Sequence, residues 1–254
     1  MTRITVLGSG TSSGVPTLAC PCEVCHSTDP RDKRLRPSVL LQYSGKNVVI
    51  DTTPDFRAQA LRAGIGRLDA VLYTHAHADH ILGLDDVRPF NFFQKATIPL
   101  YATEATFAII RRVFSYAFEE GESSRPRLDL NTIDGSPFEV FGQEFTPIRL
   151  EHGKGTVYGF RFGRAAYLTD HSVIPDASKE LLQGLDVLFL DALRRREHPT
   201  HTTLDQAVAL VEELQPRRAF FTHMCHDLGH AATEAELPPH IWLAYDGLEI
   251  EVAE

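Results

Sequence analysis

The most informative segment of the sequence is LDAVLYTHAHADH, residues 68–80. Its first half is apolar and reads as a short buried strand, and its second half is rich in metal-binding side chains, namely His75, His77, Asp79 and His80. Alternate residues of an extended segment point the same way, so His75 and His77 can bind one metal ion. The turn that follows can direct Asp79 and His80 toward a second ion. Imidazole and carboxylate ligands suit Zn²⁺, Mn²⁺ or Fe. A surface loop with Asp79 as a helix cap would explain one such residue but not four.

The bulk composition is that of an ordinary globular protein, with 254 residues, 43% hydrophobic and 23% charged. We find no repeat, low-complexity segment or linker, so we expect a single domain, residues 1–254. No apolar run reaches the length of about 18 residues that a membrane span needs, and the N-terminus, MTRITVLGSG, reads as a strand and not as a signal peptide. We therefore expect no membrane contact and a cytoplasmic location.

The formal net charge of −9 bears on the class of ligand. An extended nucleic-acid groove needs a basic surface that displaces counterions, so the acidic balance argues against one. It leaves room for a small anionic substrate held at a locally positive site.

Strands and helices are predicted in two successive groups. Strands are expected at 3–9, 38–43, 47–53, 68–75 and 218–223 and within 138–153, 156–171 and 185–193; helices are expected at 54–64, 104–120 and 202–216, and a closing hairpin at 241–252 that turns at Asp246-Gly247. Because the order is not a strict strand–helix–strand repeat, we predict two packed sheets with helices outside, an α/β sandwich. Several predicted strands end in His or Asp, as in LEHG, LTDH and FFTH, so we expect these ends to converge on one site.

The His-x-His-x-Asp-His pattern after an apolar strand resembles the signature of the metallo-β-lactamase superfamily, whose fold is a four-layer αβ/βα sandwich with a binuclear metal site. The resemblance extends through nearly the whole chain. It implies that Asp51, in NVVIDTTPD, supports the site from behind, and that the remaining ligands are His152, Asp170 and His223. On this resemblance, one metal is held by His75, His77 and His152, the other by Asp79, His80 and His223, and Asp170 bridges both.

Such a pair of divalent ions accounts for catalysis. Two ions bring a charge of about +4 against two carboxylates, and they activate water and neutralise charge on a phosphoryl group in an in-line displacement. The pattern therefore predicts a metal-dependent hydrolase that attacks with a metal-activated hydroxide, with Asp79 in the catalytic set.

Three further stretches resemble the PhnP-type phosphodiesterases of the carbon–phosphorus lyase pathway: LGSGTSSGVP with the cysteines behind it, THTTLDQAVAL, and AYDGLEI. Enzymes of that type hydrolyse small cyclic phosphodiesters, such as 5-phosphoribosyl 1,2-cyclic phosphate or 2′,3′-cyclic nucleotides. The resemblance implies that His201 acts at the phosphate as a general acid or hydrogen-bond donor. The glycine-rich loop with Ser12 could present backbone N–H groups to the phosphate or simply allow a tight turn. We also expect a homodimer.

Other polar and aromatic clusters receive weaker interpretations. Arg194, Arg195 and Arg196 are more typical of a solvated charge run than of a substrate site. Phe90, Phe92 and Phe93 could line the pocket mouth, pack into the core or form a dimer contact. No role is predicted for five histidines: His26, His171, His198, His230 and His240.

The three cysteines in TLACPCEVCHS, residues 17–27, are interpreted as parts of a metal site. Three thiolates and one imidazole make a closed tetrahedral zinc site, which is structural because no position is left for water. The resemblance to the PhnP type supplies His226 as the fourth ligand beside Cys20, Cys22 and Cys25; Cys225 is the competing candidate. The result would be a zinc-binding N-terminal loop at about 17–37 that braces the strand end carrying His223.

Two other enzymatic functions compete. A tRNA 3′-processing endonuclease shares the metal ligands and a segment like THTT, but the acidic balance and the lack of a basic Gly/Pro-rich insertion argue against it. A lactonase or thioesterase of the same fold would not require His201. A regulatory module without catalysis is disfavoured because all seven ligand positions are intact.

Overall fold

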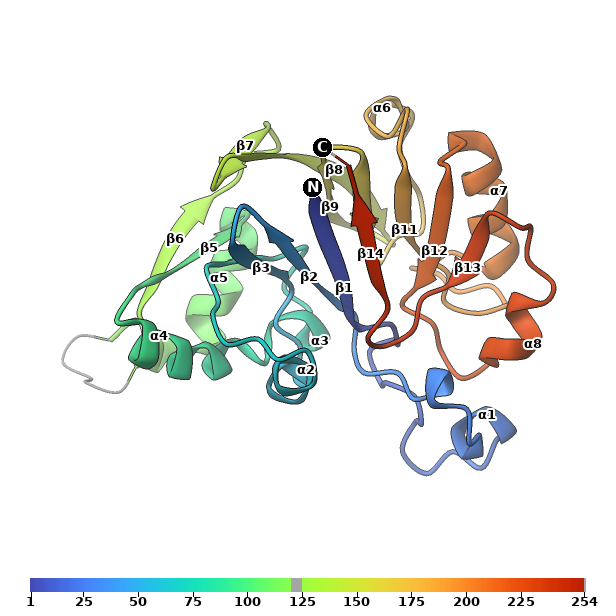
Figure 1. The fold of residues 1–254 in the computed structure, drawn as a ribbon, viewed down its shortest axis with the longest axis horizontal. Coiled ribbons are helices and arrows are strands. Elements are labelled where there is room, and N and C mark those ends of the chain that lie inside the picture. Colours follow the sequence, from blue (N-terminus) through green and yellow to red (C-terminus); the bar gives the residue numbers. More distant parts are fainter. Residues whose placement is uncertain (120–124, 254) are drawn as a thin grey trace.

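The computed structural model describes residues 1–119 and 125–253. It contains two seven-stranded sheets that face each other, with helices on the outer side of each (Figure 1). The predicted α/β sandwich is therefore confirmed. No helix among the described residues is long and apolar enough to cross a membrane. The cytoplasmic location stays a prediction.

The first sheet has the strand order β14-β1-β2-β3-β4-β5-β6. Its strands are β1 Thr2–Gly8, β2 Ser38–Tyr43, β3 Lys46–Ile50, β4 Ala70–Leu72, β5 Ile98–Ala102, β6 Leu128–Thr132 and β14 Glu249–Val252. β2 and β3 form the predicted antiparallel hairpin, and β3 to β6 run parallel.

The second sheet has the order β13-β12-β11-β10-β9-β8-β7. Its strands are β7 Phe138–Val140, β8 Gln143–His152, β9 Gly155–Phe162, β10 Ala165–Leu168, β11 Val187–Asp191, β12 Arg218–Thr222 and β13 Ile241–Leu243. The strands β10 to β13 are parallel. All five residues of β11 are buried, as expected for a central strand covered on both faces.

The helices are short and lie in the loops between strands. They are α1 Glu23–His26, α2 Phe56–Arg62, α3 Ala78–Ile81, α4 Arg88–Gln94, α5 Glu104–Val113, α6 Asp176–Glu180, α7 Leu204–Leu214 and α8 His230–Glu234, with 3₁₀ turns at Pro30–Asp32, Leu84–Val87 and Ser115–Ala117. α7 begins with a capping box, in which the Thr203 hydroxyl accepts from the Gln206 N–H and the Gln206 side chain accepts from the Thr203 N–H.

Three apolar clusters hold these layers together. The central one joins side chains from both sheets, for example Leu41 with Phe145 and Phe189. A second packs α7 on the second sheet, and a third packs the helices around Phe107 on the first. This is the four-layer arrangement, and it leaves the parallel strand ends as the place where polar side chains gather.

Two predictions about elements were wrong in detail. The helix expected at 104–120 ends at Val113, where Phe114 leaves the helical conformation, and residue 120 lies outside the described residues. The tail 241–252 is not a hairpin, because β13 pairs with β12 in one sheet and β14 with β1 in the other. The reason is Asp246: its carboxylate accepts hydrogen bonds from Ser9 and Leu35, which fasten the turn to the N-terminal sheet.

Candidate metal centre

The loop after β4 places its histidines as alternation predicted. His75 Nε2 lies 2.9 Å from His77 Nδ1, and the chain then turns into α3, which carries Asp79 and His80. Gly83 lets this turn pack closely, since a Cβ there would lie 2.0 Å from the Thr53 carbonyl oxygen. A glycine is therefore required where α3 approaches the end of β3.

The seven predicted metal-ligand residues converge in two groups. Within each group the possible ligand atoms lie within 4.8 Å of one another. The first group is His75, His77, His152 and Asp170; the second is Asp79, His80, Asp170 and His223. Asp170 belongs to both, so the arrangement matches two adjacent cation sites with one shared carboxylate.

Asp51 lies behind the second group and orients it. Its Oδ2 is 2.7 Å from His80 Nδ1, and it also accepts from the N–H and hydroxyl of Thr74. This directs His80 Nε2 toward the carboxylates of Asp79 and Asp170, each 3.3 Å away. Such support behind a metal ligand fixes its tautomer and orientation.

Three residues of the site have left-handed backbone conformations. Asp51, Asp170 and His223 have φ values of 65°, 55° and 57°. Each follows a strand, and positive φ in non-glycine residues is uncommon and enriched at functional sites. The strained turns bend the chain at the strand ends and aim the side chains at a common point.

The electrostatics of the cluster depend on its burial. Burial opposes the charge on His80, but Asp170, Asp51 and Asp79 outweigh it and raise the pKa of His80 well above its usual value. His223 is similar, with Asp170 raising its pKa to about 9 against the effect of burial. Burial and the neighbouring His80 hold the pKa of His75 well below its usual value. The buried carboxylates therefore stabilise positive charge next to them.

The residues fit divalent metal ions. His80 Nε2 and both ring nitrogens of His223 are buried, and within the described residues none makes a hydrogen bond of regular geometry, although His80 Nε2 and His223 Nε2 lie beside the Asp170 carboxylate. Unpaired polar atoms in such a place are costly unless something binds them. A mixed imidazole and carboxylate donor set of this kind suits divalent metals such as Zn²⁺, Mn²⁺ or Fe²⁺.

Asp191 is the residue that sequence reasoning missed. It ends β11 and is fully buried, with Oδ2 2.7 Å from His201 Nδ1 and Oδ1 3.9 Å from His223 Nδ1. The signal was available, because LFLDAL ends a strand in Asp just as YLTDH does. His201 itself stacks 4.7 Å from the His223 ring and lies 4.8 Å from the His152 ring, so it borders both metal groups.

The cysteine cluster lies beside this centre and includes His226. Its Nδ1 is 3.1 Å from Cys20 Sγ and 3.2 Å from Cys22 Sγ, and Cys25 completes the group. Cys225 lies outside the group, and its sulfur accepts from the Asp227 N–H. The Cys25 backbone N–H, together with His226, lowers the pKa of Cys22 to about 6. A thiolate is the form that a metal ion binds.

The weaker candidates of the sequence analysis lie mostly at the surface. Ser12 is exposed, and the backbone N–H of its neighbour Thr11 bonds to the carbonyl of Met224, next to His223. The three arginines of the 194–196 run bond to nearby carbonyl or carboxylate groups. Phe90 packs against the core, whereas Phe92 and Phe93 are 75% and 79% exposed and meet edge to face.

Known proteins resemble this chain over all or part of its length. The family model described as Beta-lactamase superfamily domain matches residues 46–224. A crystal structure described as a new diphosphatase from the PhnP family is 54% identical, with a TM-score of 0.95 over 100% of this chain and 98% of that one.

Two curated relatives match this chain over only part of their own length. An octanoyltransferase of Porphyromonas gingivalis is 40% identical over 99% of this chain and 52% of its own length. A ribonuclease Z of Bradyrhizobium diazoefficiens is 27% identical over 64% of this chain and 58% of its own length. The chain spans about half the length of the curated relatives it matches.

Proposed function

The chain belongs to the beta-lactamase superfamily, and on that premise we propose that it is a metal-dependent phosphodiesterase for a small anionic substrate. The substrate class we favour is a cyclic phosphodiester, either 5-phosphoribosyl 1,2-cyclic phosphate or a 2′,3′-cyclic nucleotide. The resemblance to a PhnP-family diphosphatase along the whole chain supports phosphoryl chemistry. The octanoyltransferase name belongs to a relative of which only 52% is matched, so we do not carry that activity over.

The metal arrangement we propose follows the two groups of donors. His75, His77 and His152 would hold one ion, Asp79, His80 and His223 would hold the other, and Asp170 belongs to both donor groups. When bound, two such ions supply an activated water and neutralise charge on the phosphoryl oxygens. The protein's own contribution is to orient the donors, exclude other ligands and deliver a proton.

The observation that carries the proposal is the Asp191–His201 pair beside these groups. Asp191 accepts from His201 Nδ1 at 2.7 Å, so the proton that His201 uses in chemistry resides on Nε2. The His201 side chain is 10% exposed, at the border between the buried donors and solvent. A hydrolase of phosphodiesters needs a donor for the departing oxygen, and a fixed imidazole can provide it. A lactonase or thioesterase would not depend on this pair.

The cysteine cluster is proposed to hold a structural zinc. Cys20, Cys22, Cys25 and His226 provide the four donors of a closed tetrahedral site. Met224, between His223 and His226, bonds through its backbone to Ser9 and Thr11. A zinc here would brace the N-terminal loop against the strand end that carries His223.

The experiment that tests the function compares substrates by kcat/KM on metal-loaded protein. The panel holds 5-phosphoribosyl 1,2-cyclic phosphate, 2′,3′-cyclic AMP, a nucleotide joined through a diphosphate, precursor tRNA and a lactone. We expect cyclic phosphodiesters to lead. A higher kcat/KM for the diphosphate or for precursor tRNA would show that the proposed substrate class is wrong. Turnover of the lactone alone would refute phosphodiester chemistry.

A further inference from the structure

A groove lies along the free edge of β13, apart from the metal donors. It consists of two adjoining cavities of about 440 and 270 Å³, both lined by Arg31, Glu234 and Trp242. The larger cavity alone is within the size range of small-molecule sites, about 300–1,000 Å³, and the smaller one extends it. The groove is built by segments far apart in the sequence, because the Asp32 carboxylate next to Arg31 accepts from the backbone N–H of His230 at the start of α8.

The floor of the groove is aromatic. Phe220 stacks under the Trp242 indole, with ring centres 5.5 Å apart and planes at 25°. Tyr245 and Leu248 extend the apolar wall of the smaller cavity. A fixed aromatic surface of this kind is suited to stacking with a flat ring.

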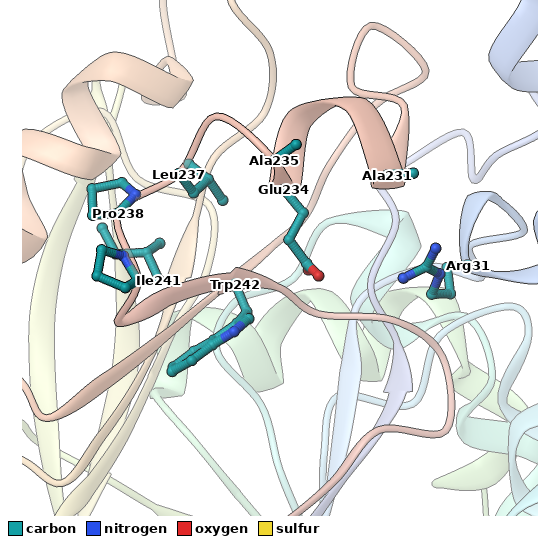
Figure 2. A pocket seen from close by; sticks show the side chains of 9 residues that line it. Arg31, Ala231, Glu234, Ala235, Leu237, Pro238, Ile241 and Trp242 are labelled. Atoms are coloured by element: carbon teal, nitrogen blue, oxygen red, sulfur yellow. The ribbon is translucent and has the colours of Figure 1, made fainter.

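Arg31 provides a hydrogen-bond donor that is already held in place. Its Nε and Nη2 bond to the Asp29 carboxylate at 2.8–3.2 Å. Within the described residues its Nη1 makes no hydrogen bond, and Figure 2 shows the guanidinium and the Glu234 carboxylate directed into one gap. An arginine fixed on one side can bind an anion on the other with little loss of entropy.

Glu234 and His230 provide matching acceptors. Glu234 Oε2 accepts from the Leu243 N–H at 3.2 Å and lies 3.2 Å from His230 Nε2, while its Oε1 bonds to nothing in 1–119 or 125–253. His230 is 1% exposed, lines the smaller cavity, and has an Nδ1 without a partner in the described chain. With Nε2 donating to Glu234, Nδ1 is an acceptor.

From this geometry we infer that the groove is a second ligand site, for a nucleoside monophosphate. The base stacks on Trp242, its amine or the ribose hydroxyls donate to Glu234 and His230, and the phosphate pairs with guanidinium groups. Arg31 and Arg218 both line the smaller cavity. Asp29 pairs with one edge of the Arg31 guanidinium, and the other edge is left to bind an anion.

The test uses the fluorescence of Trp242, which is the one tryptophan in the chain. We expect 5′-AMP to quench it in a saturable manner, whereas adenosine and ribose 5-phosphate, which each lack one recognition element, bind at least about tenfold more weakly. Arg31→Met and Glu234→Gln should each raise the dissociation constant of 5′-AMP about tenfold, the loss expected for a charged hydrogen bond.

The control variant is Arg164→Met, which removes an exposed arginine paired with Asp186 outside the groove. It should bind 5′-AMP like the parent protein. Folding of each variant is checked by its melting temperature and by phosphodiesterase activity, which groove variants should retain. No saturable quenching, or quenching that survives both groove substitutions in folded protein, would overturn the second site. If the parent protein hydrolyses no phosphodiester, the proposed function is refuted. The evidence for the second site from 5′-AMP quenching would be unaffected.

Discussion

Asp191 and His201 are joined by a 2.7 Å contact between Oδ2 and Nδ1 at the border of the two metal groups. Asp191 also approaches His223, with 3.9 Å between Oδ1 and Nδ1. One buried carboxylate therefore holds the proposed proton donor by a hydrogen bond and places its negative charge near a proposed metal ligand without bonding to it. The consequences of this arrangement differ for the two residues and can be separated by experiment.

Replacing His201 should damage catalysis without loss of metal. We expect His201→Ala to lower kcat by about 10²–10⁴, the usual contribution of a positioned general acid, with unchanged metal content by elemental analysis. His198→Ala is the matched control, since its ring lies 5.1 Å from that of His201 but makes its hydrogen bonds to Thr200. If His201→Ala loses metal, the role given to His201 is wrong.

Replacing Asp191 should affect both properties. Asp191→Asn keeps the shape but removes the negative charge beside His201 and His223, so we expect activity and metal affinity each to fall about 10–100-fold, the range seen when groups behind metal ligands are replaced. Titration of metal-free protein with Zn²⁺ or Mn²⁺ measures the metal affinity. The kcat of metal-saturated protein measures the effect on catalysis. Parent-like values for both quantities would contradict the positioning role.

Removal of metal should abolish activity in a reversible manner. Dialysis against a chelator should eliminate phosphodiester hydrolysis and lower the melting temperature, because the buried carboxylates then lose their counter-charge. Returning Mn²⁺ or Zn²⁺ should restore turnover. Hydrolysis that persists in protein shown to be metal-free would refute the proposed chemistry.

The cysteine cluster should control one zinc and part of the stability. We expect Cys22→Ser to lose one zinc per chain and at least about 2 kcal/mol of stability, or about 4–8 °C in melting temperature. Activity should fall as a secondary effect. Cys225→Ser provides the matched control, because that thiol lies outside the cluster. Full metal content in Cys22→Ser would rule out the zinc brace.

Arg34 should contribute strongly to stability, because it joins the N-terminal loop to residues 225–228. Its side chain is fully buried, pairs with Asp32 at 3.1 Å, and donates to the carbonyls of Cys225 and Leu228. Arg34→Met leaves these acceptors and a buried carboxylate unpaired, so we expect a loss of about 3–5 kcal/mol in denaturant unfolding. Arg3→Met, which removes a half-exposed ion pair, should cost less than about 1 kcal/mol. Equal effects of the two substitutions would contradict this account.

Much of the fold, and the four candidate donors of THAHADH, could be predicted from local patterns, whereas His152, Asp170 and His223 were implied by the family resemblance. The apolar strand before THAHADH, the hairpin at 38–50 and the helix at Thr203 depend on neighbouring residues, and the structure contains all of them. The resemblance to the metallo-β-lactamase superfamily is likewise confirmed by the family match. Local patterns could not predict where α5 ends or that β13 and β14 join different sheets. The separation of β13 and β14 depends on contacts between distant residues, such as those of Asp246 with Ser9 and Leu35.

The residue types available for a metal site are set by the sequence, since ligand chemistry and the alternation of His75 and His77 are local properties. The resemblance predicted His226 as the partner of the three cysteines and Asp170 as the shared carboxylate, and the folded chain brings both into those positions. The contact of Asp191 with His201 appears in the folded structure alone. The physical reason is that these contacts form where strand ends from two packed sheets converge. Left-handed turns at Asp51, Asp170 and His223 then set the direction of each side chain, and no local pattern encodes that direction.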